Sequence, residues 1–204
     1  MSGVLILGAG GHAKVVADIL CCQGTPVIGF LDDNPATWGT MRLGLPVLGG
    51  IATYRAHMPS GLILGIGDIA ARRAVVERLG ACVWDLWCNA VHPHATIANS
   101  VRLGRGVAVM ARAVINPDAI LGDHGVVNTG ATVDHDCVIE AYAHIGPGAH
   151  LAGGIRVGIG AFIGVGANIT PWLTVGDGAV VGAGSVVVGN VPCCVTVKGV
   201  PARQ

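Results

Sequence analysis

Branched aliphatic residues recur at every sixth position from Val91 to Val187. All seventeen positions of this column hold Val, Ile or Leu, and the fifth position of each hexad is mostly small. A six-residue period fits neither the 3.6-residue repeat of a helix nor plain strand alternation, but it fits a parallel β-helix in which each hexad forms one flat side. In the left-handed form three hexads close one triangular coil, so residues i and i+18 stack. The pattern therefore predicts a left-handed β-helix of five to six coils with the aliphatic column inside.

The residues before this repeat follow a different pattern. Apolar runs at 4–7, 27–31, 62–66 and 82–86 predict strands, and helical periods predict one helix through Val15, Val16, Ile19 and Leu20 and another over 69–79. A loop rich in Pro and Gly is expected at 34–50. This order of elements is typical of a Rossmann-like α/β nucleotide-binding fold. We expect two domains, residues 1–88 and residues 89–204.

Glycines follow the first predicted strand, at Gly8, Gly10 and Gly11, and a helix begins there. Bare backbone at a helix N-terminus receives phosphate. Asp32 and Asp33 end the second strand about 20 residues later, where an acid commonly meets the ribose or base. A dinucleotide needs two βαβαβ halves, and this domain has room for little more than one, so we expect a single nucleotide. The alternative is a tight turn and a polar strand end without a ligand.

Composition and charge narrow the class of protein. Hydrophobic residues make up 52% of the chain, but no apolar run reaches the roughly 18 residues of a membrane span. The formal net charge is +0, with no basic stripe, so neither nucleic acid nor a membrane surface is expected. Seven cysteines without a C-x-x-C pair indicate reduced thiols and a cytoplasmic location. The opening residues carry no basic region, so no signal peptide is expected.

Most outward positions of the repeat hold side chains without an evident catalytic role, and the exceptions lie between residues 128 and 153. His135 can accept a proton near neutral pH, and Asp136 beside it can orient the ring. Its stacked neighbours, Pro117 and Gly153, are compact, so we expect open space beside the ring. His144 lies half a coil further on, about 15 Å away on another side. The two histidines can share a pocket only across a subunit boundary, which predicts a symmetric trimer. The alternative is a solvated loop pair.

The remaining polar residues of the repeat favour simpler roles. Four histidines have no second ligand at metal-like spacing, so no metal is expected: His92, His94, His124 and His150. Cys137 follows the His–Asp pair but occupies the inward column, where we expect it to pack rather than to react.

Residues 127–139 and 143–153 resemble the active-site signature of hexapeptide-repeat sugar acetyltransferases. These are the nucleotide-linked 4-amino-sugar N-acetyltransferases of bacillosamine and perosamine synthesis and the related sialic acid O-acetyltransferases. The similarity extends to residues 8–12, 30–33 and 199–203. It implies an acyltransferase that uses acetyl-CoA as co-substrate, without a metal, in a homotrimer with its active sites at the subunit interfaces.

The resemblance also implies roles for individual residues. His135 matches the general base, and Asp136 matches an acid that is often Glu in the family, which leaves its orienting role open. The residues matched to acetyl-CoA contacts are His144, Gly153, Val165 and Ala183. The residues matched to the nucleotide sugar are Gly10, Gly11, His12, Asp32, Asp33, Gly67 and Arg72, with Asn128 beside the amino sugar.

The implied reaction is direct transfer of an acetyl group to the 4-amino group of a UDP- or GDP-linked 4-amino-4,6-dideoxy sugar, with UDP slightly favoured. A sugar ammonium cannot attack a thioester, so His135 would take its proton. A backbone N–H or His144 would stabilise the oxyanion. Two alternatives stay open: an O-acetyltransferase acting on sialic acid or another sugar, and a non-catalytic solenoid that binds a sugar nucleotide.

Overall fold

The computed structural model describes residues 3–204 and divides the chain into two compact units. The first unit ends at Pro93 and the second comprises His94–Gln204. The sequence places the change five residues earlier, between residues 88 and 89. In both descriptions the α/β segment comes first and the repeat second.

The first unit is an α/β fold with one mainly parallel sheet. Its elements are β1 (Val4–Leu7), α1 (Gly11–Cys22), β2 (Val27–Leu31), η1 (Pro35–Thr37), β3 (Met41–Arg42), β4 (Leu45–Gly49), η2 (Ile51–His57), β5 (Gly61–Leu64), α2 (Ile69–Leu79), η3 (Ala81–Leu86) and β6 (Ala90–Val91). The five-stranded sheet has the order β3-β4-β2-β1-β5, and only β3 runs antiparallel to its neighbour. All four residues of β1 are buried, as expected for a central parallel strand covered on both faces.

Most predicted elements of this unit are confirmed, with two corrections. Residues 82–86, predicted as a strand, belong to the 3₁₀ helix η3. Val83 and Leu86 lie three residues apart, which aligns them on one side of such a helix, and both contact the same apolar core. The predicted loop 34–50 contains β3 and β4, because Val47 fills a buried position opposite Phe30 in the sheet.

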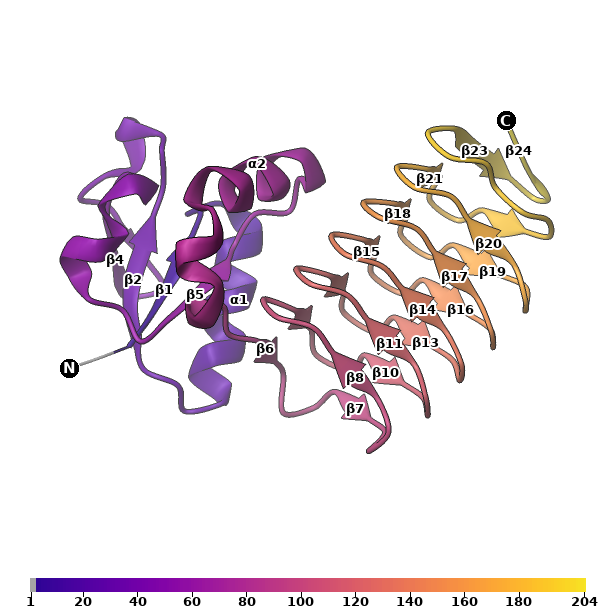
Figure 1. The fold of residues 1–204 in the computed structure, drawn as a ribbon, viewed down its shortest axis with the longest axis horizontal. Coiled ribbons are helices and arrows are strands. Elements are labelled where there is room, and N and C mark those ends of the chain that lie inside the picture. Colours follow the sequence, from indigo (N-terminus) through magenta and orange to yellow (C-terminus); the bar gives the residue numbers. More distant parts are fainter. Residues whose placement is uncertain (1–2) are drawn as a thin grey trace. The chain divides into compact units, whose positions relative to one another are not determined.

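The second unit is a parallel β-helix. Its strands are β7 (Thr96–Ile97), β8 (Arg102–Leu103), β9 (Ala108–Val109), β10 (Val114–Ile115), β11 (Ile120–Leu121), β12 (Val126–Val127), β13 (Thr132–Val133), β14 (Val138–Ile139), β15 (His144–Ile145), β16 (His150–Leu151), β17 (Arg156–Val157), β18 (Phe162–Ile163), β19 (Asn168–Ile169), β20 (Thr174–Val175), β21 (Val180–Val181), β22 (Val186–Val187), β23 (Thr196–Gly199) and β24 (Ala202–Arg203). Figure 1 shows the coils stacked one upon the next. From Ile97 onward every aliphatic column residue is the second residue of a two-residue strand.

The three sides of the β-helix confirm the predicted 18-residue stacking. One sheet has the order β22-β19-β16-β13-β10-β7, a second has the order β20-β17-β14-β11-β8, and the third includes β24-β23-β21-β18-β15-β12-β9 in that order. Within the first sheet, for example, Thr132 pairs with His150 and His150 with Asn168. The aliphatic column residues from Val109 to Val187 are buried and form the core of the unit, whereas Ile97 and Leu103 in the first coil are half-buried.

Tight corners separate the strands and give particular residues a left-handed backbone. The fourth hexad position has a positive φ in several coils, including 60° at Asp136, 68° at Gly154 and 63° at Trp172. Glycine tolerates this conformation best, and Asp also tolerates it, whereas Trp rarely adopts it. These three residues are stacked 18 residues apart at one corner, and that corner carries the chemistry described below.

The structure also bears on membrane-spanning helices and on the state of the cysteines. Within residues 3–204, no helix combines the length and the apolar character that a membrane crossing needs. All seven cysteines are free thiols in this structure.

Candidate active site

The His135–Asp136 pair lies on the turn between β13 and β14. The Nδ1 atom of His135 lies 2.7 Å from Oδ2 of Asp136, and about half of each side chain is exposed. This hydrogen bond, with the charges of Asp134 and Asp136, raises the pKa of His135 above its ordinary value. With Nδ1–H donating to the carboxylate, Nε2 is left as the proton acceptor. The shorter Asp136 therefore does reach the imidazole.

A second carboxylate holds the turn. Oδ1 of Asp134 accepts hydrogen bonds from Nδ2 of Asn116 at 2.7 Å and from the backbone N–H of His135 at 2.8 Å. These donors lower the pKa of Asp134, so it stays ionised. Asn116 was not selected from the sequence, although its position 18 residues before Asp134 could have identified it.

The ring of His135 packs on a glycine. A Cβ atom built on Gly153 would lie 2.6 Å from both Cε1 and Nε2 of His135, so the imidazole occupies the space that Gly153 leaves. The expected open space is therefore filled by the ring itself. Trp172 contacts the ring edge-on, with centroids 6.5 Å apart, and also covers Gly154. Sequence reasoning missed Trp172, which lies 18 residues after Gly154 and is 70% exposed.

A second cluster surrounds His144 on β15, which belongs to a different sheet from β13. His144 is buried, stands edge-on to Phe162, and has Nε2 3.2 Å from Nδ2 of Asn128. Oδ1 of Asn128 accepts the backbone N–H of Thr129, which leaves its amide nitrogen to donate. An amide nitrogen only donates, so Nε2 of His144 accepts and Nδ1 carries the proton.

The residues matched to acetyl-CoA fall into two groups. Val165 and Ala183 follow β18 and β21, in the same sheet as His144, and both are exposed. Gly153 follows β16 instead and lies with His135 at another corner. The His135 cluster and the His144 cluster therefore lie on separate sides of the β-helix, as the spacing of the two histidines predicts. Below, these two clusters are called half-sites.

Cys137 has the packing role expected from its column. It is fully buried, and its thiol donates to the carbonyl of Ala152 at 3.2 Å. Burial raises the pKa of this thiol, which disfavours the nucleophilic thiolate.

The first unit carries a glycine-rich hollow of about 310 Å³, lined by Gly8, Ala9, Gly10, Gly11, His12, Asp32, Gly65, Ile66, Gly67 and Asp68. It lies where β1, β2 and β5 end and α1 begins. Gly10 is the N-cap of α1 and makes no side-chain cap hydrogen bond. A Cβ atom on Gly10 or Gly11 would meet nothing within 4 Å, so the helix N-terminus is accessible to a phosphate.

The two aspartates at the end of β2 have different surroundings. Asp32 lines the hollow and accepts the backbone N–H groups of Ala9 at 2.7 Å and Asn34 at 2.8 Å. Asp33 accepts the N–H of Ile51 at 2.9 Å and pairs with Arg78 at 2.5 Å. Asp33 is not part of the hollow's lining, so the structure brings only Asp32 to this predicted site.

His12 and Arg72 are two basic side chains of this region: His12 is half-buried and lines the hollow, whereas Arg72 is buried. Arg72 is 1% exposed and donates to the carbonyl oxygens of Gly67 at 3.1 Å and Ile66 at 3.4 Å. Burial lowers its pKa to about 10. Burial, followed by the charge of Arg72, lowers the pKa of His12 to about 4, so this ring is neutral at pH 7. Arg72 thus holds the backbone of residues 66 and 67 through these hydrogen bonds, and it does not line the hollow itself.

Residues 3–79 match the family model of the PglD N-terminal domain. UDP-N-acetylbacillosamine N-acetyltransferase of Bacillus subtilis (strain 168) is 36% identical over 119 residues, which cover 54% of this chain and 52% of that protein. The chain thus spans about half the length of this curated relative.

Several solved structures match along nearly the whole chain. A histidine-to-asparagine mutant of perosamine N-acetyltransferase from Caulobacter crescentus, in complex with CoA and GDP-perosamine, is 44% identical with a TM-score of 0.92, over 100% of this chain and 96% of that one. The acetyltransferase domain of PglB from Neisseria gonorrhoeae, in complex with acetyl coenzyme A, is 37% identical with a TM-score of 0.89, over 98% and 97%.

Proposed function

The chain belongs to the family of hexapeptide-repeat sugar acetyltransferases, and from this premise we propose that it transfers the acetyl group of acetyl-CoA to the 4-amino group of a nucleotide-linked 4-amino-4,6-dideoxy sugar. The observation that carries the proposal is the His135–Asp136 pair, an oriented imidazole with a raised pKa and a proton-accepting Nε2 on the solenoid surface. The glycine-rich hollow of the first unit is the proposed nucleotide site. We expect the enzyme in the cytoplasm, with reduced thiols.

The identities favour a GDP-linked sugar. The perosamine enzyme, whose structure contains GDP-perosamine, is 44% identical across this whole chain. The bacillosamine enzyme is 36% identical over 119 residues only. GDP-perosamine is therefore the first substrate to test, and a UDP-linked 4-amino sugar is the second.

The reaction follows from the oriented base. The sugar amine attacks the thioester carbonyl, and Nε2 of His135 takes the proton that the nitrogen loses. The C–N bond forms, the C–S bond breaks, and the CoA sulfur leaves with the proton that His135 returns. Holding both substrates in one site supplies much of the rate acceleration. The proposed donor that stabilises the oxyanion is His144 or a backbone N–H.

The split between the two half-sites supports a homotrimer. His135 and His144 stand on different sides of one β-helix, so we propose that His135 of one protomer acts together with His144 of the partner subunit. Mixing the inactive variants His135→Ala and His144→Ala, with subunit exchange, should then restore part of the activity. Trimers should appear in sedimentation equilibrium, and a monomer with full activity contradicts this arrangement.

The test measures the CoA formed from acetyl-CoA by chromatography. A thiol reagent is unsuitable for detecting CoA here, because the protein's five exposed cysteines would also react with it. GDP-perosamine, a UDP-linked 4-amino sugar and free sialic acid serve as acceptors. Loss of His135 in His135→Ala should reduce turnover about 10²- to 10⁴-fold. The control His94→Asn removes an exposed histidine outside both half-sites and should keep full activity. Turnover on sialic acid alone would identify an O-acetyltransferase, and unchanged turnover in His135→Ala contradicts the mechanism.

A further inference from the structure

Three side chains of metal-ligating type meet in the first unit, away from the glycine-rich hollow. Asp18 and Cys22 lie on α1, and His92 follows β6 directly. One ligand atom of each residue lies within 4.8 Å of the ligand atoms of the other two. His92 is 9% exposed, whereas Asp18 and Cys22 are exposed to solvent. A buried imidazole thus faces an exposed carboxylate and an exposed thiol.

The local geometry suits a tetrahedral ion. Asp18 and Cys22 are four residues apart on a helix, which places them on one face, one turn above the other. Zinc binds sulfur at about 2.3 Å and nitrogen or oxygen at about 2.0–2.2 Å, so ligand atoms of one tetrahedron lie roughly 3.3–3.7 Å apart. Rotation of the two exposed side chains brings atoms at up to 4.8 Å into that range.

We propose that Asp18, Cys22 and His92 bind one Zn²⁺ ion, with a solvent molecule as the fourth ligand. Mixed sulfur, nitrogen and oxygen ligands are typical of zinc, a borderline-soft ion. The ligands of α1 lie two to three turns, about 10–16 Å, from its N-terminus at the glycine-rich hollow. The ion therefore takes no part in nucleotide binding. It ties the second half of α1 to the segment that follows β6.

The proposed zinc site cannot be recognised from the sequence, because its ligands lie far apart along the chain. His92 has no histidine or cysteine partner at metal-like spacing, and its partners come from a helix some seventy residues earlier. Zinc binding would displace the proton of the Cys22 thiol, so affinity should rise with pH.

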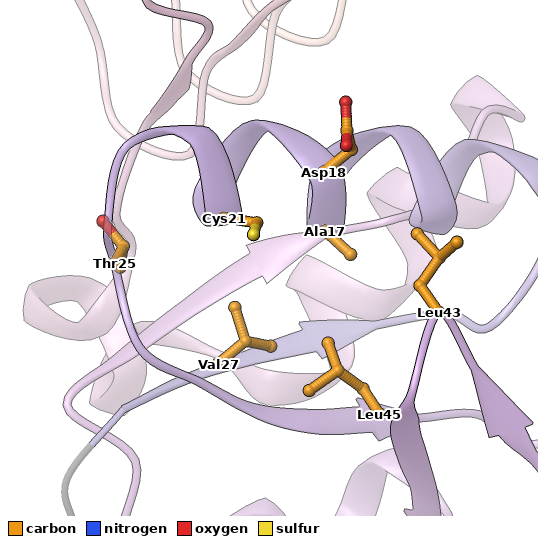
Figure 2. A pocket seen from close by; sticks show the side chains of 7 residues that line it. All are labelled: Ala17, Asp18, Cys21, Thr25, Val27, Leu43 and Leu45. Carbon is orange, nitrogen blue, oxygen red and sulfur yellow. The ribbon is translucent and has the colours of Figure 1, made fainter.

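Cys21 provides a matched control. It is also exposed, and it precedes Cys22 on the same helix. Figure 2 shows its side chain directed toward an apolar hollow between α1 and the strands, which Asp18 also borders. Cys21→Ser removes another exposed thiol of the same helix and leaves the three proposed ligands unchanged.

The experiment titrates tag-free, chelator-treated full-length protein with Zn²⁺ by calorimetry, and with Co²⁺ by its thiolate charge-transfer and visible d–d absorption. We expect one equivalent to bind with a tetrahedral cobalt spectrum, and zinc to raise the melting temperature. Cys22→Ser should abolish the thiolate charge-transfer band. Cys22→Ser and Asp18→Asn should each weaken zinc binding more than about 100-fold, which exceeds the effect of losing a residue that only hydrogen-bonds to a metal ligand. Cys21→Ser should bind like the wild type. Absence of stoichiometric binding, or a band that persists in Cys22→Ser, overturns the proposal.

Discussion

Substitution Gly153→Ala tests whether the position of the His135 ring controls catalysis. The new methyl group would lie 2.6 Å from Nε2 and Cε1 of His135. Ordinary contact begins near 3.4 Å, so the ring must move by about 0.8 Å. The backbone at Gly153 has no left-handed φ, so alanine itself fits there. A displacement of about 1 Å in a reacting group can reduce the rate about 100-fold, and we expect kcat to fall by that order.

The same movement should disturb the hydrogen bond between His135 and Asp136. The pKa of His135, measured by NMR titration of its ring, should then fall toward the ordinary value in Gly153→Ala. This readout separates ring displacement from a lost backbone contact with acetyl-CoA, which would raise KM for acetyl-CoA and leave the titration unchanged. Gly189→Ala is the control, because a Cβ atom at Gly189 meets nothing within 4 Å. A kcat within twofold of wild type together with an unchanged titration would refute the reasoning.

Three other perturbations follow from the same structure. Asp136→Asn should lower the pKa of His135 and move the acid limb of the kcat/KM profile to lower pH, while Asp136→Glu should restore most of the turnover. Trp172→Ala should reduce kcat about 2- to 10-fold by freeing the His135 ring, and Trp172→Phe should keep most of it. The pKa of His12 is about 4 in the folded protein and 6.5 in the unfolded chain, so as the pH falls the unfolded chain protonates His12 first. The free energy of unfolding, measured with urea, should therefore be level above pH 6.5 and fall by about 3 kcal/mol between pH 6.5 and 4. A level curve in that window contradicts the assignment.

Much of the fold could be predicted because the local pattern and the burial agree. Each aliphatic column residue from Ile97 to Val187 ends a short strand, and those from Val109 onward are buried in the core, so a single six-residue period defines three sheets. The helix over 69–79 was also predicted with its observed bounds. The prediction for residues 82–86 was wrong because five residues with one buried and one partly buried apolar side chain fit either a strand or a 3₁₀ helix. Only packing against the core distinguishes the two.

The site was less accessible to sequence reasoning, because its contacts join residues 18 positions apart. His135 and Asp136 are neighbours in the chain, and their chemistry is readable from their types. The contacts of His135 with Gly153 and Trp172 depend on the side-chain conformations of residues in neighbouring coils, which the sequence does not show. Asp33 was placed at the nucleotide site because it ends β2, yet its carboxylate pairs with Arg78 on α2, a partner 45 residues away.

The 18-residue stacking of the solenoid limits how its length can change. Deleting one hexad would rotate every later residue to the next side of the prism, so the side chains beyond the cut would face a different neighbour while the core column remained aliphatic. Deleting eighteen residues would remove a whole coil and leave each remaining side chain on its own side. Insertions and deletions of eighteen residues therefore keep every side chain on its own face of the β-helix. Insertions and deletions of six residues keep the fold but move the later side chains to a different face.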